Sequence, residues 1–380
     1  MEKTYEEINE KIRKGKAVVL TAEQVSEMAR TMSPKEILNK VDVVTTATFG
    51  AMCSSGAILN FGHATPPIRM ERIELNGVPV SGGLAAVDTF VGATDCNPQR
   101  PDYGGAHIIQ ELIDGKSVTL EAWAKGTDCY PRTHIKTNVS LETMNEAILS
   151  NPRNAYQNYN VAVNSSDRIR YTYMGTLLPN FKNASYSSAG ELSPLLNDPE
   201  CRTIGLGTRI FLAGAQGYVT YNGTQFNTSK PVNKFGVPMG GSRTIAVAGE
   251  MREMNSRFLR GAYFEKYGVT LYLGIGVPIP VLDEDMAACV SIRNEQIETY
   301  IEDYGDDFKL IGTTNYAALR SGEIEFNGHR IHTAPLSSLA RAREIADILK
   351  GWIEKGEFLL AAPTRPMPAN RSIKSLEENL

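Results

Sequence analysis

The sequence lacks any segment that could span a membrane or direct secretion. No apolar run approaches the length of about 20 residues that a bilayer-spanning helix requires. The N-terminus, MEKTYEEINEKIRKGKAVVL, is a charged helical pattern without the apolar centre of a signal peptide. We therefore expect a cytoplasmic protein that does not bind membranes.

An excess of one charge is also lacking. The chain has 39 basic and 43 acidic residues, a net charge of −4, and no run of like charges. This balance gives no long-range attraction to nucleic acid, so a nucleic-acid partner is not expected. Apolar residues make up 42% and charged residues 22%, as in ordinary globular proteins. A length of 380 residues favours two domains or one elaborated domain.

The motifs of several enzyme classes are missing. The five cysteines contain no CxxC pair, which argues against zinc, iron–sulfur and thioredoxin-like sites. The five histidines form no HExxH motif, so no catalytic metal is expected. There is no GxSxG of a serine hydrolase and no GK[ST] of a phosphate-binding loop. The string GLGTRI has isoleucine where a dinucleotide-binding fingerprint needs its third glycine. No cofactor is expected to be bound through a motif.

Two of the cysteines do not lie in the apolar surroundings of a structural thiol. Cys53 lies in FGAMCSSGAILNFGHATPP and Cys129 in AWAKGTDCYPRTH, among residues typical of turns. Cys289, in DMAACVSI, fits a buried structural thiol, whereas Cys96 and Cys201 are left open. Exposed, polar surroundings are where a thiol can ionise and meet a small substrate. The sequence therefore predicts thiol chemistry at Cys53 and Cys129.

The Cys53 segment contains further candidate groups. If AILNFGH begins a helix, Cys53 lies near its N-terminus, where the helix dipole favours a thiolate. His63 is a candidate proton donor, and Arg69 a candidate carboxylate ligand. The alternative is a glycine-rich packing turn with an incidental cysteine.

The Cys129 segment has Arg132 and His134 close by, which favour a thiolate, whereas Asp128 opposes it. Together with Cys53, this thiol could cycle between dithiol and disulfide if folding brings the two together.

Glycine-rich strings follow several expected strands. One of them, LYLGIGVPIP, resembles a glycine-rich loop of coenzyme A transferases; the alternative is a tight turn at a strand end. Arg209 and Arg243 lie beside such strings and are candidate ligands for a small anion.

Strand-like and helix-like segments alternate, which predicts an α/β fold of mixed sheets with flanking helices and glycine-rich strand-end loops. Strands are expected at residues 41–49, 72–80, 117–124, 169–178, 209–221, 243–250 and 269–281. Helices are expected within residues 21–41 (two), and at 107–115, 140–151, 253–268 and 337–358. Residues 1–363 are expected to form the folded part, with an internal break near 150–160 left open. Residues 364–380, rich in proline and poor in apolar residues, are expected to form a flexible tail.

With both cysteine segments in view, the chain resembles the sulfur-incorporation domain of the homocysteine biosynthesis proteins. The resemblance rests on four strings in order: TTATFGAMCSSGAILNFGH, YGGAHIIQELIDGK with GTDCYPR, LSPLLNDPECRTIGLGTRIFLAGAQG, and LGIGVPIPVLDEDMA. It implies an L-aspartate semialdehyde sulfurtransferase, which replaces the aldehyde oxygen by sulfur and yields L-homocysteine. The family's two functional cysteines correspond to Cys53 and Cys129. Methanogen members work with a small ferredoxin-like protein, which implies a separate electron donor here.

Making a thiol from an aldehyde and sulfide requires two electrons, and a cysteine pair can deliver them. In this hypothesis Cys129 carries a persulfide and Cys53 is its resolving partner. The sulfur donor, sulfide or another compound, is left open. An external reductant then restores the dithiol. His134 or His63 is the candidate general acid. The candidate substrate-binding residues are Arg69, Arg132, Arg209 and Arg243.

Two alternatives remain open. The first is a cysteine- or carboxylate-dependent acyl or coenzyme A transferase, which would form a thioester and need no reductant. The second is a non-enzymatic sulfur carrier or metabolite-binding protein. A homo-oligomer is also left open.

Overall fold

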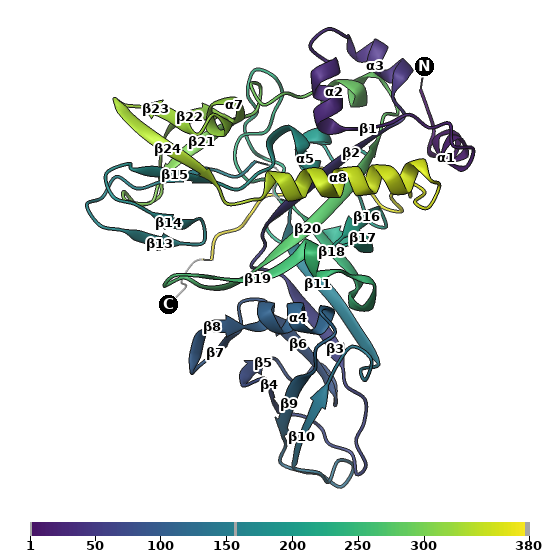
Figure 1. Cartoon of the computed structure of the whole chain (residues 1–380), viewed down its shortest axis with the longest axis vertical. Helices are drawn as coiled ribbons and strands as arrows, with labels where there is room; N and C mark the ends of the chain where they lie inside the picture. Colours follow the sequence, from purple (N-terminus) through teal and green to yellow (C-terminus); the bar gives the residue numbers. More distant parts are fainter. Residues whose placement is uncertain (1, 156–157, 377–380) are drawn as a thin grey trace.

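The computed structural model describes residues 2–155 and 158–376, which form a mixed α/β fold (Figure 1). The expected class, mixed sheets with flanking helices, is confirmed. Within the described residues, no helix is long and apolar enough to cross a membrane.

A ten-stranded sheet forms the centre of the molecule. Its strands, in spatial order, are β1 (Val19–Thr21), β2 (Val43–Ala51), β20 (Gly268–Pro280), β16 (Arg209–Leu212), β17 (Ala215–Asn222), β18 (Ile245–Glu250), β11 (Glu146–Asn154), β3 (Gly56–Asn60) and β6 (Asp88–Gly92), with β19 (Leu259–Phe264) paired to β20.

This sheet is strongly curled, and the short connection between β2 and β3 shows why it must be. Five strands lie between them in the sheet order, so a flat sheet would separate them by about 29 Å at about 4.8 Å per strand. The five steps from Ala51 to Gly56 span at most about 18 Å. The two ends of the sheet therefore approach each other at the turn that carries Cys53.

Two further sheets extend from the centre. A four-stranded sheet, at the bottom of Figure 1, has the order β10 (His134–Val139), β9 (Val118–Trp123), β4 (Arg72–Leu75) and β5 (Val78–Val80). A six-stranded sheet has the order β22 (Lys309–Asn315), β21 (Glu298–Asp303), β12 (Val161–Val163), β15 (Asn183–Tyr186), β24 (His329–Pro335) and β23 (Glu323–Phe326). Two hairpins complete the strands: β7 (Cys96–Asn97) with β8 (Arg100–Gly104), and β13 (Arg170–Thr172) with β14 (Gly175–Leu177).

The six-stranded sheet has its own hydrophobic cluster, which begins at Val161 and is distinct from the large cluster around the central sheet. β11, which occupies residues 146–154, belongs to the central sheet and pairs on both sides. The domain boundaries proposed from the sequence, including a break near 150–160, stay a prediction.

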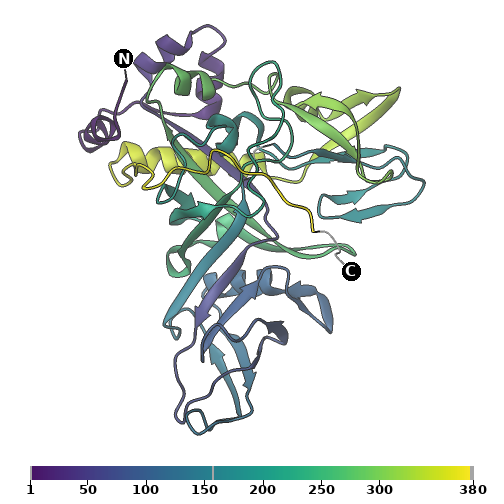
Figure 2. The same cartoon turned by 180° about the vertical axis from the view of Figure 1, so that it is seen from behind.

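The helices lie around the edges and over one side of the central sheet (Figures 1 and 2). They are α1 (Tyr5–Arg13), α2 (Ala22–Met28), α3 (Pro34–Lys40), α4 (Gly105–Ile113), α5 (Pro194–Asn197), α6 (Glu284–Cys289), α7 (Tyr316–Arg320) and α8 (Leu339–Glu354), with 3₁₀ turns η1 (Gly190–Leu192), η2 (Met251–Glu253) and η3 (Ser256–Phe258). The two helices expected within residues 21–41 are confirmed, and capping boxes at Thr21 and Ser33 begin them.

The string LGIGVPIP lies inside β20 and forms neither a strand-end loop nor a turn, so both interpretations of it were wrong. Its glycines let α8 pack closely on the strand. A Cβ at Gly274 would lie 2.7 Å from Ile345 Cδ1, and one at Gly276 would lie 2.9 Å from Ile345 Cγ2. The motif that suggested coenzyme A transferases therefore serves packing.

Two expected helices, and the helix considered as a condition at AILNFGH, are wrong. The start of AILNFGH lies in β3, half of residues 140–151 belongs to β11, and residues 253–268 contain η3 and β19. Each of these strands pairs within the central sheet, and that pairing outweighs the helical pattern of the local sequence. The expected strands and the helices at 107–115 and 337–358 are confirmed in type.

Part of the expected tail is bonded to the body of the molecule. The Thr364 amide donates to the Leu206 carbonyl oxygen at 2.8 Å, and the Thr228 amide donates to that of Arg371 at 2.9 Å. The flexibility of residues 364–380 stays a prediction.

Candidate active site

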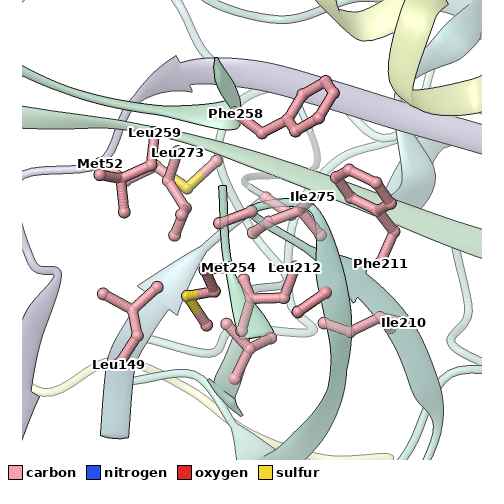
Figure 3. Packing of buried hydrophobic residues seen from close by; sticks show 14 of the residues in the cluster. Met52, Leu149, Ile210, Phe211, Leu212, Met254, Phe258, Leu259, Leu273 and Ile275 are labelled. Atoms are coloured by element: carbon pink, nitrogen blue, oxygen red, sulfur yellow. The ribbon is translucent and has the colours of Figure 1, made fainter. Parts of the chain in front are cut away.

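Cys53 lies at the centre of a tight turn between β2 and β3. The Ser55 amide donates to the Met52 carbonyl oxygen at 3.0 Å, which leaves Cys53 and Ser54 as the two central residues of the turn. Met52 points into the hydrophobic core, where Figure 3 shows it beside Leu259 and Leu273. Cys53 is only partly buried and lines a cavity. Because β3 is a strand, the expected helix N-terminus at Cys53 does not exist.

A buried asparagine ties this turn to β11. The Asn151 amide nitrogen donates to Ser55 Oγ at 2.7 Å, and its oxygen accepts a bond of 2.8 Å from the Arg153 amide. Ser54 Oγ donates to the carbonyl oxygen of Arg153 at 2.7 Å. The backbones that carry Cys53 and Arg153 are therefore fixed relative to each other.

The cavity at Cys53 has a volume of about 340 Å³. Arg153 is the only charged side chain among the described residues that line it. No ion pair of Arg153 is found among residues 2–155 and 158–376, so its guanidinium group is available to an anion. A nucleophilic sulfur and an arginine that share a small cavity suit a small substrate with one carboxylate and one electrophilic carbon.

Tyrosines form another wall of the cavity. Tyr173, in the turn of the β13–β14 hairpin, and Tyr267, in the turn between β19 and β20, both line it. Tyr173 Oη accepts hydrogen bonds from Tyr159 Oη at 2.9 Å and from Tyr304 Oη at 2.7 Å. Burial first, and then charge and hydrogen-bond interactions with Cys53, raise the pKa of Tyr267 to about 12. The Tyr267 hydroxyl is therefore a neutral donor beside the thiol at neutral pH.

Cys129 lies elsewhere. It is exposed in the loop of residues 124–133, between β9 and β10, at the bottom of Figures 1 and 2. Its neighbour Tyr130 stacks on His63, with ring centres 6.1 Å apart. His63 follows the far end of β3, and β3 alone is about 13 Å long. Since a disulfide requires Cα atoms within about 7 Å, Cys53 and Cys129 of one chain cannot form one in this conformation.

The histidines proposed as acids are both at the Cys129 end of the molecule. His63 is exposed, and His134 Nε2 lies 3.1 Å from Glu121 Oε1 on the neighbouring strand. Arg132 is there too, and donates to the Thr65 carbonyl oxygen at 2.8 Å. These residues form a second cluster with Cys129, and none of them lines the Cys53 cavity.

The other proposed arginines also lie outside the cavity. Arg69 is exposed on the loop before β4. Arg209 donates to the Leu359 carbonyl oxygen at 3.3 Å and covers the Phe358 ring. Arg243 is buried and pairs with Glu200 at 2.7 Å. Their proposed substrate-binding roles stay predictions, although Arg243 already has a carboxylate partner.

Neither Arg153 nor Tyr267 was predicted from the sequence as a site residue. Arg153 lies in a polar segment where a domain break was left open, and Tyr267 lies in a segment that was expected to be a helix. No local motif marks either residue, because each reaches the cavity only through the pairing of distant strands.

The remaining cysteines differ in their surroundings. Cys96 is exposed, whereas Cys201 is buried and Cys289 partly buried. Burial raises the pKa of Cys289 to about 11 and that of Cys201 well above its usual value, which fits structural thiols. Among the described residues, no group of three or more His, Cys, Asp or Glu could hold a metal ion.

Comparisons with known proteins agree with one another. A family model described as "Homocysteine biosynthesis enzyme, sulfur-incorporation" matches residues 17–360. A Methanosarcina acetivorans protein named L-aspartate semialdehyde sulfurtransferase is 48% identical over 382 residues, which cover 100% of this chain and 74% of that protein. A Methanocaldococcus jannaschii protein of the same name is 48% identical over 394 residues, covering 98% of this chain and 75% of the relative. An uncharacterized Methanothermobacter thermautotrophicus protein is 28% identical over 85% of this chain and 73% of its own length. No solved structure matches.

Proposed function

Because the chain belongs to the family of homocysteine biosynthesis enzymes that incorporate sulfur, we propose that it is an L-aspartate semialdehyde sulfurtransferase whose substrate binds in the Cys53 cavity. The product is L-homocysteine. The choice of site rests on the cavity shared by the Cys53 thiol and the guanidinium group of Arg153, for which the described part of the chain offers no ion-pair partner.

The substrate's chemistry suits this cavity. Aspartate semialdehyde carries a carboxylate at one end and an aldehyde at the other, separated by two carbon atoms. Arg153 binds the carboxylate through paired hydrogen bonds, which places the aldehyde toward Cys53. The volume of about 340 Å³ is at the small end of the range for ligand sites and suits a four-carbon substrate.

The overall reaction balances with sulfide as the sulfur donor. The aldehyde, hydrogen sulfide, two electrons and two protons give the thiol and one water molecule. An external reductant, of the ferredoxin-like class that the family resemblance implies, supplies the electrons. If sulfur arrives instead as the outer atom of a persulfide, two further electrons are needed, because that sulfur is more oxidised than sulfide.

Cys53 and Cys129 have different roles in this proposal. Cys53 lies in the cavity and meets the substrate, whereas exposed Cys129 takes the outer sulfur atom of a sulfane-sulfur donor, such as a persulfide, which is left as a thiol, and carries that atom to Cys53 as its own persulfide. With sulfide as the donor no persulfide forms, and sulfide reaches the cavity directly. Since β3 separates the two thiols, transfer requires movement of the loop at 124–133 or a second copy of the chain. Of the four electrons that the persulfide route needs, two come from the cysteine pair as it forms a disulfide, and the external donor supplies the other two. The same donor then restores the dithiol. A cytoplasmic location remains part of the proposal.

An anaerobic assay tests this function. The purified protein is incubated with aspartate semialdehyde, sulfide and a strong reductant, and homocysteine is followed by mass spectrometry. We expect product from the wild type and from Cys96→Ser, whose thiol is exposed and outside the cavity, but none from Cys53→Ser. Failure of the wild type with a reductase system also present would contradict the proposed function.

A further inference from the structure

Tyr267 is placed where it can act on Cys53. It lies in the short turn between β19 and β20, and its side chain lines the same cavity as the thiol. After burial, the nearby Cys53 thiol contributes to raising the pKa of Tyr267 to about 12. The residue as a whole is 39% exposed.

The turn and its neighbours hold this ring in position. The Tyr267 amide donates to the Phe264 carbonyl oxygen at 3.0 Å, which closes the turn. The ring centre lies 6.2 Å from that of Tyr173 and 6.3 Å from that of Phe264. Tyr173 is in turn fixed by hydroxyl bonds from Tyr159 and Tyr304. Few positions of the Tyr267 ring are compatible with these contacts.

We propose that Tyr267 is a catalytic residue, which holds the Cys53 sulfur by its hydroxyl group and moves a proton from that sulfur to the aldehyde oxygen of the substrate. The assignment rests on the proposed function, since it names the proton-transfer residue of the same site. Neither histidine proposed from the sequence lines the cavity, so Tyr267 takes the role that was expected of them.

The step balances within the site. A bond forms between Cys53 Sγ and the aldehyde carbon, and the carbon–oxygen π bond breaks. The oxygen takes the hydroxyl proton of Tyr267, and Tyr267 takes the proton of the thiol. The product is a hemithioacetal on Cys53. Tyr267 begins and ends neutral and no electrons leave or enter, so this step needs no reductant.

The charged and titratable groups around the pair are few. Among the described residues that line the cavity, they are Arg153 on β11, Tyr173 in the β13–β14 turn and Tyr159 after β11. Lys266, next to Tyr267, points to the Tyr171 ring, with Nζ 4.3 Å from the ring centre. When the pH changes, the charge near Cys53 and Tyr267 is therefore affected by only one other kind of group, the tyrosines, since Arg153 keeps its positive charge.

The test is Tyr267→Phe, which keeps the ring and removes the hydroxyl group. Tyr218→Phe is the matched control, because Tyr218 is 47% exposed on β17 and lies outside the cavity. Two readouts are taken: the rate of iodoacetamide alkylation of Cys53 against pH, read by peptide mass spectrometry, and steady-state formation of homocysteine.

If Tyr267 holds the sulfur as proposed, the alkylation profile of Tyr267→Phe moves to higher pH, because phenylalanine cannot donate a hydrogen bond to a sulfur anion. We also expect kcat to fall about 100-fold or more with little change in KM, the size typical of losing a general acid–base group. Tyr218→Phe should match the wild type in both readouts. An unchanged alkylation profile, or an unchanged kcat, in Tyr267→Phe overturns the assignment.

Alkylation needs no substrate, so it separates this assignment from the proposed function. If the wild type makes no homocysteine and the profile of Tyr267→Phe still moves, the sulfurtransferase proposal fails while Tyr267 remains the donor to Cys53. If the profile does not move, the assignment fails whether or not the wild type makes homocysteine.

Discussion

Asn151 and Ser55 are joined by a hydrogen bond of 2.7 Å from the Asn151 side-chain amide to Ser55 Oγ. Asn151 is fully buried, and its oxygen also accepts a bond from the Arg153 amide. One side chain thus connects the turn of the proposed nucleophile with the strand of the proposed carboxylate ligand. The Cys53 thiol and the Arg153 side chain, far apart in sequence, therefore start from backbones that are fixed relative to each other. Catalysis requires such groups to be positioned to within fractions of an ångström.

Replacing this connection should weaken both stability and activity. Asn151→Ala leaves the Arg153 amide without its side-chain acceptor and removes one of two hydrogen bonds from each of Ser54 Oγ and Ser55 Oγ, which should cost about 1–3 kcal/mol in the free energy of unfolding. The loss is measured by urea unfolding, and kcat/KM is measured alongside. Asn138→Ala, at an exposed position of β10, is the control and should stay within about 0.5 kcal/mol of the wild type. Equal stability of the two variants would contradict the role given to Asn151.

Arg153 should control substrate binding. Among the described residues that line the cavity, Arg153 has the only charged side chain, and Arg153→Gln removes that charge. Because the substrate carboxylate then loses its partner, the KM for aspartate semialdehyde should rise about 10- to 100-fold. Arg153→Lys should recover only part of the loss, since lysine cannot form the paired hydrogen bonds of a guanidinium group. Arg13→Gln, on the exposed face of α1, should leave KM unchanged. A KM for Arg153→Gln equal to that of the wild type would remove Arg153 from the site.

Substrate should protect one of the two proposed functional thiols. With aspartate semialdehyde bound under non-reducing conditions, iodoacetamide should alkylate Cys53 much more slowly, because the substrate fills the cavity that Cys53 lines. Cys129 and Cys96 are exposed and should react at the same rate with or without substrate. Peptide mass spectrometry measures all three in one sample. Protection of Cys129 rather than Cys53 would place the substrate at the other end of the molecule.

Acid should destabilise the protein partly through Asp42. Burial opposes its ionisation, but hydrogen bonds from Lys11, Val18 and Lys3 outweigh it and hold the pKa of Asp42 below its usual 3.8. Because the folded-state pKa is the lower one, this carboxylate stabilises the fold above about pH 4, and the contribution is lost as pH falls through the lowered value.

Asp42→Asn should therefore be less stable than the wild type by about 1–3 kcal/mol at pH 7, with the difference shrinking below pH 4. Urea unfolding across the pH range measures it. Asp114→Asn, at an exposed position after α4, is the control. A difference that grew on acidification would show that the sign assigned to Asp42 is wrong.

The glycines of LGIGVPIP should prove structural. Gly276→Val forces a side chain against Ile345 and Phe211, which should cost about 1–3 kcal/mol through overpacking between α8 and β20. Gly351→Ala, where a Cβ meets nothing within 4 Å on α8, should be neutral or stabilising by about 1 kcal/mol. Thermal unfolding compares the two. A Gly276→Val protein as stable as the wild type would argue that α8 does not pack as described.

Strands with strong local signals could be predicted from the sequence. The buried apolar run of β2 and the hairpins of β4–β5 and β16–β17 follow from β-branched residues bounded by turn residues. The helix α8 follows from an apolar stripe of helical period. β3, β11 and β19 could not be predicted, because their helical patterns are overridden by strand partners that lie far away in the sequence.

By itself, the sequence determined that thiol chemistry is to be sought at Cys53 and Cys129, because turn residues around a cysteine are a local property. It also determined the family, since long ordered strings do not depend on the fold being known. Only the tertiary structure decided that Arg153 and Tyr267 share a cavity with Cys53, and that Cys129 lies beyond the far end of β3. The physical reason is that a curled sheet brings strands from distant parts of the chain to one point, and no local pattern encodes where those strands meet.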